Sequence, residues 1–327
     1  MTATGERRHS HGPARPWVAL AVALALAACS DDPVAPDEEP ATLHGIGGWT
    51  EFDQFAVGDG GSILRYRGTE WRPFDSPTEK ALFDVVGFSA SAAVVVGADG
   101  TILRFNGTTF SLEPSPTPNT LRALYGASTA NMIAVGDGGV VIENDGGGWQ
   151  SVASPTAERL LGVWAVDSGE AYAVGVAGEV LHRTAGTWVR DTPFTSSTLR
   201  AVWADKPGDW FAVGDGGEIW QNRGVGWTPM VSPRSDDLHD VFGSDSAYVF
   251  TVGDTDSVLF YDQIAWRPIV PIPTGRFEAI WATICPLPSP AARANAAVHC
   301  SNTYFAGTEG TVARFTLLGT YEILAGP

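Results

Sequence analysis

From residue 42 onward, apolar residues recur in short alternating runs rather than at the spacing of a helix. In one such run an aromatic residue stands two positions before a Val-Gly pair, as in Phe55, Val57 and Gly58. A period of two with β-branched and aromatic residues is typical of strands. Gly-rich segments such as residues 58–61 (GDGG) follow these runs, and Gly supplies the positive φ of a tight turn. The pattern predicts an all-β domain of short strands.

The Val-Gly pair, which is Ala-Gly in its last occurrence, marks an internal repeat. Its glycines are Gly58, Gly97, Gly136, Gly175, Gly214, Gly253 and Gly307. Five successive intervals are 39 residues, and the last is 54, so one insertion of 15 residues explains the irregular interval. An apolar anchor stands 15 residues before each glycine, or 30 in the last unit: Leu43, Leu82, Leu121, Leu160, Leu199, Leu238 and Phe277. The chain therefore contains one unit seven times.

Each unit predicts four strands. The first follows the anchor, the second ends at the Val-Gly pair, the third is an apolar run such as residues 63–66, and an aromatic residue such as Trp71 marks the fourth. Pro-containing segments then end the unit, because Pro cannot donate to a strand ladder. Four antiparallel strands per repeat of about 40 residues match a propeller blade, whereas the coils of a β-solenoid are shorter and parallel. We predict a seven-bladed β-propeller of four-stranded antiparallel blades over residues 42–327. The units as delimited leave no strand to exchange across the seam, so closure would rest on face packing, unless the blade boundaries are shifted.

Composition agrees with this architecture and excludes some partners. The 327 residues include 38 Gly and 22 Pro, and 44% are hydrophobic, which favours a folded core with many turns. The formal net charge is −17, and no basic stripe of the kind that nucleic-acid binding requires is present. We expect no nucleic-acid partner, no cofactor and no metal.

Residues 1–28 predict an export signal. Arg7, Arg8 and Arg15 precede an apolar run at residues 17–28 that ends on small residues. This run has 12 residues, short of the roughly 20 that a membrane-spanning helix needs.

Residues 26–29 (LAAC) resemble the bacterial lipobox, in which the Cys thiol is lipidated and the chain is cut just before it. The resemblance implies a lipoprotein that begins at Cys29, and the alternative is an ordinary signal peptide with an incidental Cys. Residues 29–41 are acidic and rich in Pro, which predicts a tether without a packed core. We expect an exported chain, anchored to a bacterial membrane by lipid alone, on the periplasmic or cell-surface side.

The repeat V-G-D-G-G-x-I-L-x-x-x-x-G-x-x-W resembles the BNR or Asp-box-like propellers of bacteria. It is most similar to the class that contains the photosystem II assembly and stability factor, which is seven-bladed and exported or lipid-anchored. The similarity covers residues 42–327, but residues 144–149 and 184–188 depart from the Asp-box pattern S-x-D-x-G-x-T-W. The resemblance implies the fold, and a photosynthetic role does not follow because one fold hosts many functions.

Cys285 and Cys300 lie in the single insertion and are the only cysteines after Cys29. Because an exported chain meets an oxidising compartment, we predict a disulfide between them. A zinc site with His299 is disfavoured, since the spacing lacks a chelating pattern. The insertion falls between the first two strands of the seventh blade, where it is either a recognition loop or a stapled decoration.

One position after each anchor stand His44, Phe83, Arg122, Leu161, Arg200, His239 and Glu278. If the first strand is innermost, as in propellers generally, these residues form a ring at the central channel. The candidate binding residues are His44, Arg122, Arg200, His239 and Glu278, and we predict that this mouth accepts an acidic group. The alternative is that these side chains bridge neighbouring blades through carboxylates such as Asp84 and Asp240.

No catalytic motif is legible. The repeated Asp59, Asp137, Asp215 and Asp254 lie in Gly-rich segments, where Asp is a common turn residue, and the recurring Trp of the fourth strand is interpreted as packing. The regular units leave no long catalytic loops. The favoured function is a monomeric, lipid-anchored propeller of the cell envelope that binds a protein or assembles a complex. The alternative is a carbohydrate-active or other hydrolytic propeller, which a converging carboxylate pair in a deep central pocket would favour.

Overall fold

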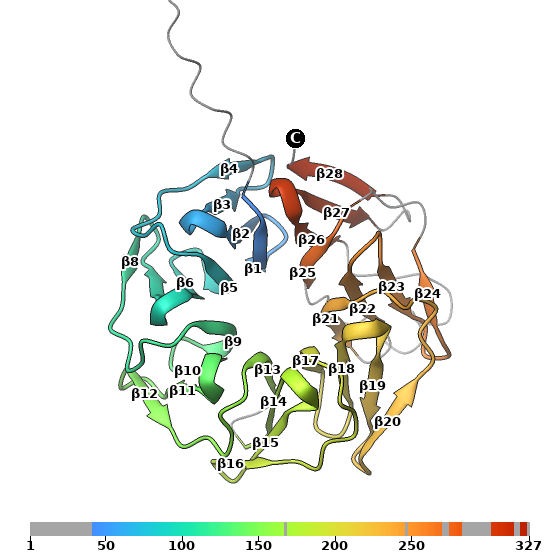
Figure 1. Ribbon diagram of the computed structural model, residues 1–327. Helices are drawn as coiled ribbons and strands as arrows, with labels where there is room; N and C mark the ends of the chain where they lie inside the picture. Colours follow the sequence, from blue (N-terminus) through green and yellow to red (C-terminus); the bar gives the residue numbers. More distant parts are fainter. Residues whose placement is uncertain are drawn as a thin grey trace, which may run out of the picture. The chain divides into compact units, whose positions relative to one another are not determined.

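The computed structural model describes seven four-stranded sheets arranged around a central axis (Figure 1). It describes residues 41–166, 169–245, 248–269, 275–282, 302–316 and 321–325. Residues 39–327 form a compact unit of their own, and in every sheet the strands pair antiparallel in chain order. The predicted seven-bladed β-propeller of four-stranded antiparallel blades is therefore confirmed. Within the described residues, no helix is long and apolar enough to cross a membrane.

The innermost strand of each blade begins at the apolar anchor of the repeat. These strands are β1 (Leu43–Thr50), β5 (Leu82–Ser89), β9 (Leu121–Ser128), β13 (Leu160–Ala165), β17 (Leu199–Ala204), β21 (Leu238–Asp245) and β25 (Phe277–Ala282). The second strands end at the repeat glycine: β2 (Asp53–Gly58), β6 (Ala92–Gly97), β10 (Asn131–Gly136), β14 (Ala171–Gly175), β18 (Trp210–Gly214), β22 (Tyr248–Gly253) and β26 (Asn302–Gly307).

The third and fourth strands complete each blade toward its outer edge. The third strands are β3 (Ile63–Tyr66), β7 (Ile102–Phe105), β11 (Val141–Asn144), β15 (Val180–Thr184), β19 (Ile219–Asn222), β23 (Val258–Tyr261) and β27 (Val312–Thr316). The outermost strands are β4 (Trp71–Pro73), β8 (Phe110–Leu112), β12 (Trp149–Val152), β16 (Thr187–Arg190), β20 (Trp227–Met230), β24 (Trp266–Pro268) and β28 (Tyr321–Ala325). The aromatic residue predicted to mark the fourth strand lies in this outermost strand in the first six blades.

Short 3-10 turns join the second and third strands in six blades. They are η1 (Asp59–Gly61), η2 (Ala98–Gly100), η3 (Asp137–Gly139), η4 (Val176–Gly178), η5 (Asp215–Gly217) and η6 (Thr308–Gly310). The middle residue of each turn has a positive φ, which is +62° for Gly60 but also +55° for Ala177. The repeat glycine serves another purpose, because a Cβ on Gly136 would lie 1.9 Å from the carbonyl oxygen of Thr120. The Gly-rich motif thus combines a left-handed turn with a close backbone approach.

The hydrophobic core lies between neighbouring blades. In one cluster, Ile133 and Val135 of β10 pack with Leu160 and Val163 of β13 in the next blade. The seven anchors are at most 1% exposed. Burying one Leu side chain stabilises the fold by about 2 kcal/mol. Because each blade covers its faces against its two neighbours, the ring must close.

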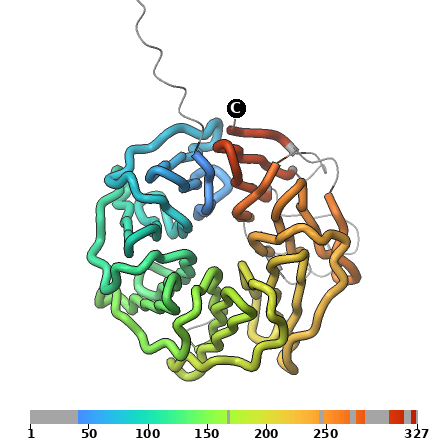
Figure 2. Tube along the Cα trace, viewed as in Figure 1, coloured from blue at the N-terminus to red at the C-terminus, as the bar shows by residue number. Residues whose placement is uncertain are grey.

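Closure occurs between the seventh and first blades without an exchanged strand. Each of these two sheets is made of four strands that are consecutive in the chain. Leu43 and Ala56 of the first blade pack with Tyr304 and Ala306 of the seventh, and the Tyr304 hydroxyl donates to the carbonyl oxygen of Glu51 at 3.1 Å. Figure 2 shows the blue first blade beside the red last blade at this seam. Face packing therefore closes the ring, as the sequence predicts.

Several predicted features lie outside the described residues. These are the export signal at residues 1–28, the lipidation site at Cys29, the tether up to residue 40, the disulfide between Cys285 and Cys300, and the insertion that contains this pair. All of them stay predictions from the sequence.

Candidate functional site

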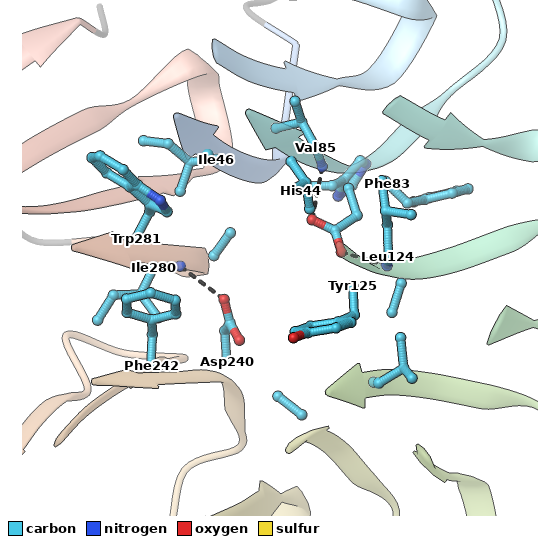
Figure 3. A pocket seen from close by; sticks show the side chains of 18 of the residues that line it. His44, Ile46, Phe83, Val85, Leu124, Tyr125, Asp240, Phe242, Ile280 and Trp281 are labelled. Atoms are coloured by element: carbon cyan, nitrogen blue, oxygen red, sulfur yellow. Dashed lines mark hydrogen bonds between the residues drawn. The ribbon is translucent and has the colours of Figure 1, made fainter. Parts of the chain in front are cut away.

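A cavity of about 300 Å³ occupies the centre of the ring and is lined by the innermost strands of all seven blades. The seven residues that follow the anchors line it, as predicted, and are called the mouth ring below: His44, Phe83, Arg122, Leu161, Arg200, His239 and Glu278. The same cavity is lined by Asp84 and Asp240, one position after the mouth ring, and by an aromatic layer three positions after it, made of Tyr125, Trp164, Phe242 and Trp281. Figure 3 shows Asp240, Tyr125, Phe242 and Trp281 around this space.

A β-bulge places the mouth ring in the channel. In the first blade Leu43 pairs with Gly58 and Gly45 pairs with Val57, so His44 is an extra residue without a partner across the ladder. The same shift occurs at this position in all seven blades. Without the bulge, two successive side chains would point to opposite faces of the strand. With it, the mouth-ring residue and the residue after it both line the cavity in every blade except the first.

Arg122 illustrates how the charged members of the mouth ring are held. Its guanidinium donates through two nitrogens to the two oxygens of Asp137, at 2.9 and 3.1 Å, and lies 4.7 Å from the ring centre of Phe83. Arg159 donates to the same Asp137 at 2.8 Å. Hydrogen bonds from Arg122, together with the charges of both arginines, hold the pKa of Asp137 below its ordinary value. Asp137, which the sequence predicted only as a turn residue, therefore also balances the positive charge of Arg122 in the mouth ring.

Ring residues of the first and fifth blades also form ion pairs with the carboxylate of the following turn. Nε2 of His44 lies 2.8 Å from Oδ1 of Asp59. Arg200 donates to Asp215 at 2.5 Å and to Asp237 at 3.3 Å. Asp59 and Asp215 each stand 15 residues after their ring residue, at the start of the turn.

His239 is the most enclosed member of the mouth ring. Its side chain is 4% exposed, with Nε2 at 3.0 Å from Asp254 and Nδ1 at 2.9 Å from Glu278 of the next blade. Arg276 contacts both of these carboxylates, at 3.2 and 2.6 Å. Burial alone would raise the pKa of Glu278, but the hydrogen bond from His239 and the two neighbouring positive charges lower it overall. The mouth therefore presents paired charges rather than free positive charge.

Asp84 and Asp240 have different partners from those expected. Asp84 accepts the backbone N–H of Val85 and of Leu124 in the next blade, both at 2.7 Å. The expected bridge between blades does not run through Asp84, because backbone amides hold this carboxylate. A ring side chain does bridge two blades through another carboxylate, since His239 contacts Glu278 of the next blade.

Asp240 repeats this arrangement on the far side of the channel. It accepts the N–H of Val241 at 2.8 Å and of Ile280 in the next blade at 2.9 Å (Figure 3). Burial raises the pKa of Asp84 to about 7, and burial together with the charge of Asp84 raises that of Asp240 to about 8, against the lowering effect of the backbone N–H groups.

The aromatic layer covers only part of the channel wall. Tyr125 meets Trp164 edge-on at 5.1 Å between ring centres, and Trp164 meets Phe242 edge-on at 5.7 Å. The indole N–H of Trp164 donates to the carbonyl oxygen of Ala204 at 2.8 Å, which fixes its ring. The corresponding positions of the first two blades are Gly47 and Val86, so the layer is open on that side.

This arrangement does not provide an acid and a base. A hydrolytic pair needs two carboxyl groups with well-separated pKa values. Burial raises the pKa of both Asp84 and Asp240 instead. All four of their oxygens already accept a backbone N–H. In the part of the chain that the structure describes, no group of three or more His, Cys, Asp and Glu side chains could hold a metal ion.

Sequence reasoning identified the mouth ring but missed the roles of Asp84 and Asp240. The signal for them was present, because the other five repeats have Gly or Ala at this position. Two acidic residues therefore replace a small residue at one position of the repeat. Such a departure from the repeat indicates a candidate functional site.

Comparison with known proteins places the chain by its fold. No protein-family model matches it, and no curated protein matches it in sequence. Among solved structures, YCF48 bound to D1 peptide is 17% identical with a TM-score of 0.65, over 85% of this chain and 93% of that chain. YCF48 from Cyanidioschyzon merolae is also 17% identical, with a TM-score of 0.66 over 86% and 97% of the two chains.

The chain is also similar to a third solved structure, a WD40 propeller. The WD40 β-propeller domain of Doa1 is 9% identical with a TM-score of 0.68, over 84% of this chain and 92% of that chain. Similarity at these identities shows the seven-bladed fold. The structural likeness to YCF48, a photosystem II assembly factor, agrees with the class that the repeat resembles.

Proposed function

We propose that this chain is an exported, lipid-anchored propeller of the cell envelope that binds a protein partner at the mouth ring. The observation that carries the proposal is a contrast between the repeats. The anchor is Leu in six blades and Phe in the seventh, whereas the mouth ring contains five residue types in seven blades. Every ring position has the same bulged backbone. The fold therefore does not require these differences, and they are suited to recognising an asymmetric partner.

The ion pairs of the mouth ring are suited to contact with a protein. The side chains of Arg122 and Asp137 are 27% and 31% exposed, so both groups reach solvent while they hold each other. A partner can exchange one member of such a pair without leaving a buried charge alone. The comparisons support the same class of function, since one similar propeller is bound to a peptide.

The cellular location of the protein is part of this proposal. Residues 1–28 direct export, Cys29 carries the lipid, and residues 29–41 tether the propeller to the membrane. Substitution Cys29→Ser should leave an uncleaved or soluble chain in place of a membrane-bound one. Mass spectrometry of the mature amino terminus and fractionation of the cell envelope measure both outcomes.

Photo-crosslinking in the producing cells tests the proposed contact surface. The photoreactive residue p-benzoylphenylalanine replaces Leu161, an uncharged member of the mouth ring, or Val189 on the outermost strand β16, which is 47% exposed. We expect a protein adduct of constant mass from position 161 and none from position 189. Neither substitution touches the ion pairs, so both variants should fold as the wild type does.

A second pair of measurements decides between binding and hydrolysis. Adducts from position 189 alone, or from neither position, would overturn the proposed mouth contact. In that case the purified propeller is assayed against glycans and chromogenic hydrolase substrates, because the hydrolytic class then becomes the better account of the channel.

A further inference from the structure

Two carboxyl groups face the channel below the mouth ring from opposite sides. Asp84 belongs to the second blade and Asp240 to the sixth, and each holds two backbone amides. A carboxylate accepts about four hydrogen bonds, so each group has acceptor capacity left on its channel side. Figure 3 shows Asp240 pointing into the space onto which Tyr125, Phe242 and Trp281 also open.

Carboxylates outnumber arginines at the mouth above these carboxyl groups. The ion pairs around the mouth ring bring together four arginines, two histidines and six carboxylates: Arg122, Arg159, Arg200, Arg276, His44, His239, Asp59, Asp137, Asp215, Asp237, Asp254 and Glu278. Every arginine of this set already has a carboxylate partner. The six carboxylates of this set outnumber its four arginines, and the whole chain has a formal charge of −17. This field attracts a cation and repels an acid.

The aromatic layer favours the same kind of ligand independently of the carboxyl groups. The face of an aromatic ring carries partial negative charge and attracts an ammonium or guanidinium group within about 6 Å. Rings from four blades line this cavity: Tyr125, Trp164, Phe242 and Trp281. Its volume of about 300 Å³ lies at the small end of ligand pockets, which suits one side chain rather than a folded segment.

We propose that the channel accepts one cationic side chain, the Lys or Arg of a protein partner, with its charge beside Asp84 and Asp240 and its aliphatic part against the aromatic layer. This inference rests on the proposed function, because the side chain belongs to the protein that binds at the mouth ring. It replaces the expected acidic ligand with a basic one, since turn carboxylates already satisfy the ring arginines.

Protonation of the two carboxyl groups gives this binding a measurable signature. With pKa values of about 7 and about 8, both groups are largely protonated at about pH 6 and largely ionised at about pH 9. An entering cation favours the ionised form, so binding releases protons and strengthens as the pH rises. Charged side chains from the neighbouring strands line the same channel and belong to this balance: His44 and Arg122 around Asp84, and Arg200, His239 and Glu278 around Asp240.

Isothermal titration calorimetry of the propeller with two small probes tests the inference. Residues 39–327 form a compact unit and are used alone. The first probe is N-acetyl-arginine methylamide, and the second is the citrulline analogue, which has nearly the same shape without the charge. We expect the arginine probe to bind at least about tenfold more tightly at about pH 9 than at about pH 6, because the ionised fraction of Asp84 rises about tenfold. The citrulline probe should show no such change.

Variants assign the effect to the two carboxyl groups. The double variant Asp84→Asn/Asp240→Asn should lose the pH dependence of arginine binding. The matched control is Asp145→Asn, which changes an exposed turn carboxylate outside the cavity. If the double variant does not fold, the two probes on the wild-type propeller decide the question alone.

Three outcomes would overturn the inference: equal affinity for both probes, no arginine binding between about pH 6 and pH 9, or full binding in the double variant. Crosslinks from position 161 without arginine binding would leave the proposed function standing and remove only the cationic occupant. If neither crosslinks from position 161 nor arginine binding is observed, the proposed function is refuted as well.

Discussion

Replacing Asp84 and Asp240 by Asn removes two groups that make the stability of the fold depend on pH. Burial raises their pKa values from 3.8 to about 7 and about 8. Between about pH 4 and pH 8 the folded protein therefore holds protons that the unfolded chain has released, and its free energy of unfolding falls as the pH rises. The stabilisation is complete below about pH 4 and is lost as the pH passes through each folded pKa.

The magnitude follows from these two pKa values. Integrating the proton balance from about pH 6 to pH 9 gives a loss of about 1 kcal/mol through Asp84 and about 3 kcal/mol through Asp240, or about 4 kcal/mol together. Ordinary carboxyl groups are ionised throughout this range and contribute no slope. The double variant should lose this slope, although it is less stable at about pH 6 because each Asn turns an NH₂ group toward a backbone N–H, at about 1–3 kcal/mol per site.

Urea unfolding followed by tryptophan fluorescence measures this effect on residues 39–327 at several pH values between about 6 and 9. The control Asp145→Asn should follow the wild type, because its carboxyl group lies on an exposed turn. The reasoning is refuted if the wild type and the double variant lose stability in parallel, or if the wild type gains stability toward pH 9.

Three further substitutions test the framework of the propeller by urea unfolding. Gly136→Ala should cost about 3 kcal/mol, because its Cβ would lie 1.9 Å from a carbonyl oxygen and the backbone must move. Ala177→Gly should raise the unfolding midpoint by the equivalent of about 0.5–1 kcal/mol, since Ala177 has a φ of +55° that Gly adopts without strain. Tyr304→Phe removes the hydroxyl that donates to Glu51 across the closing seam and should cost about 1 kcal/mol, together with faster unfolding in a kinetic experiment.

The sequence by itself determined the number of blades and the order of strands within each blade. These features depend on local chemistry: alternating residues form strands, Gly permits positive φ, and a repeat of 39 residues returns the same blade each time. The absence of a left-over strand also follows from the first anchor, Leu43, because it opens a complete unit. The structure confirms each of these points.

The chemistry of the channel was decided by tertiary structure. The repeat predicted that His44 and its equivalents lie at the channel. No local pattern shows the β-bulge at these positions, or that the turn carboxylates reach back to neutralise Arg122 and Arg200. The backbone partners of Asp84 and Asp240 lie in the following blades, 40 residues along the chain, and the two groups act on each other only after the ring has closed. Burial and electrostatic coupling depend on which segments surround a group in space, and seven distant segments build this cavity together.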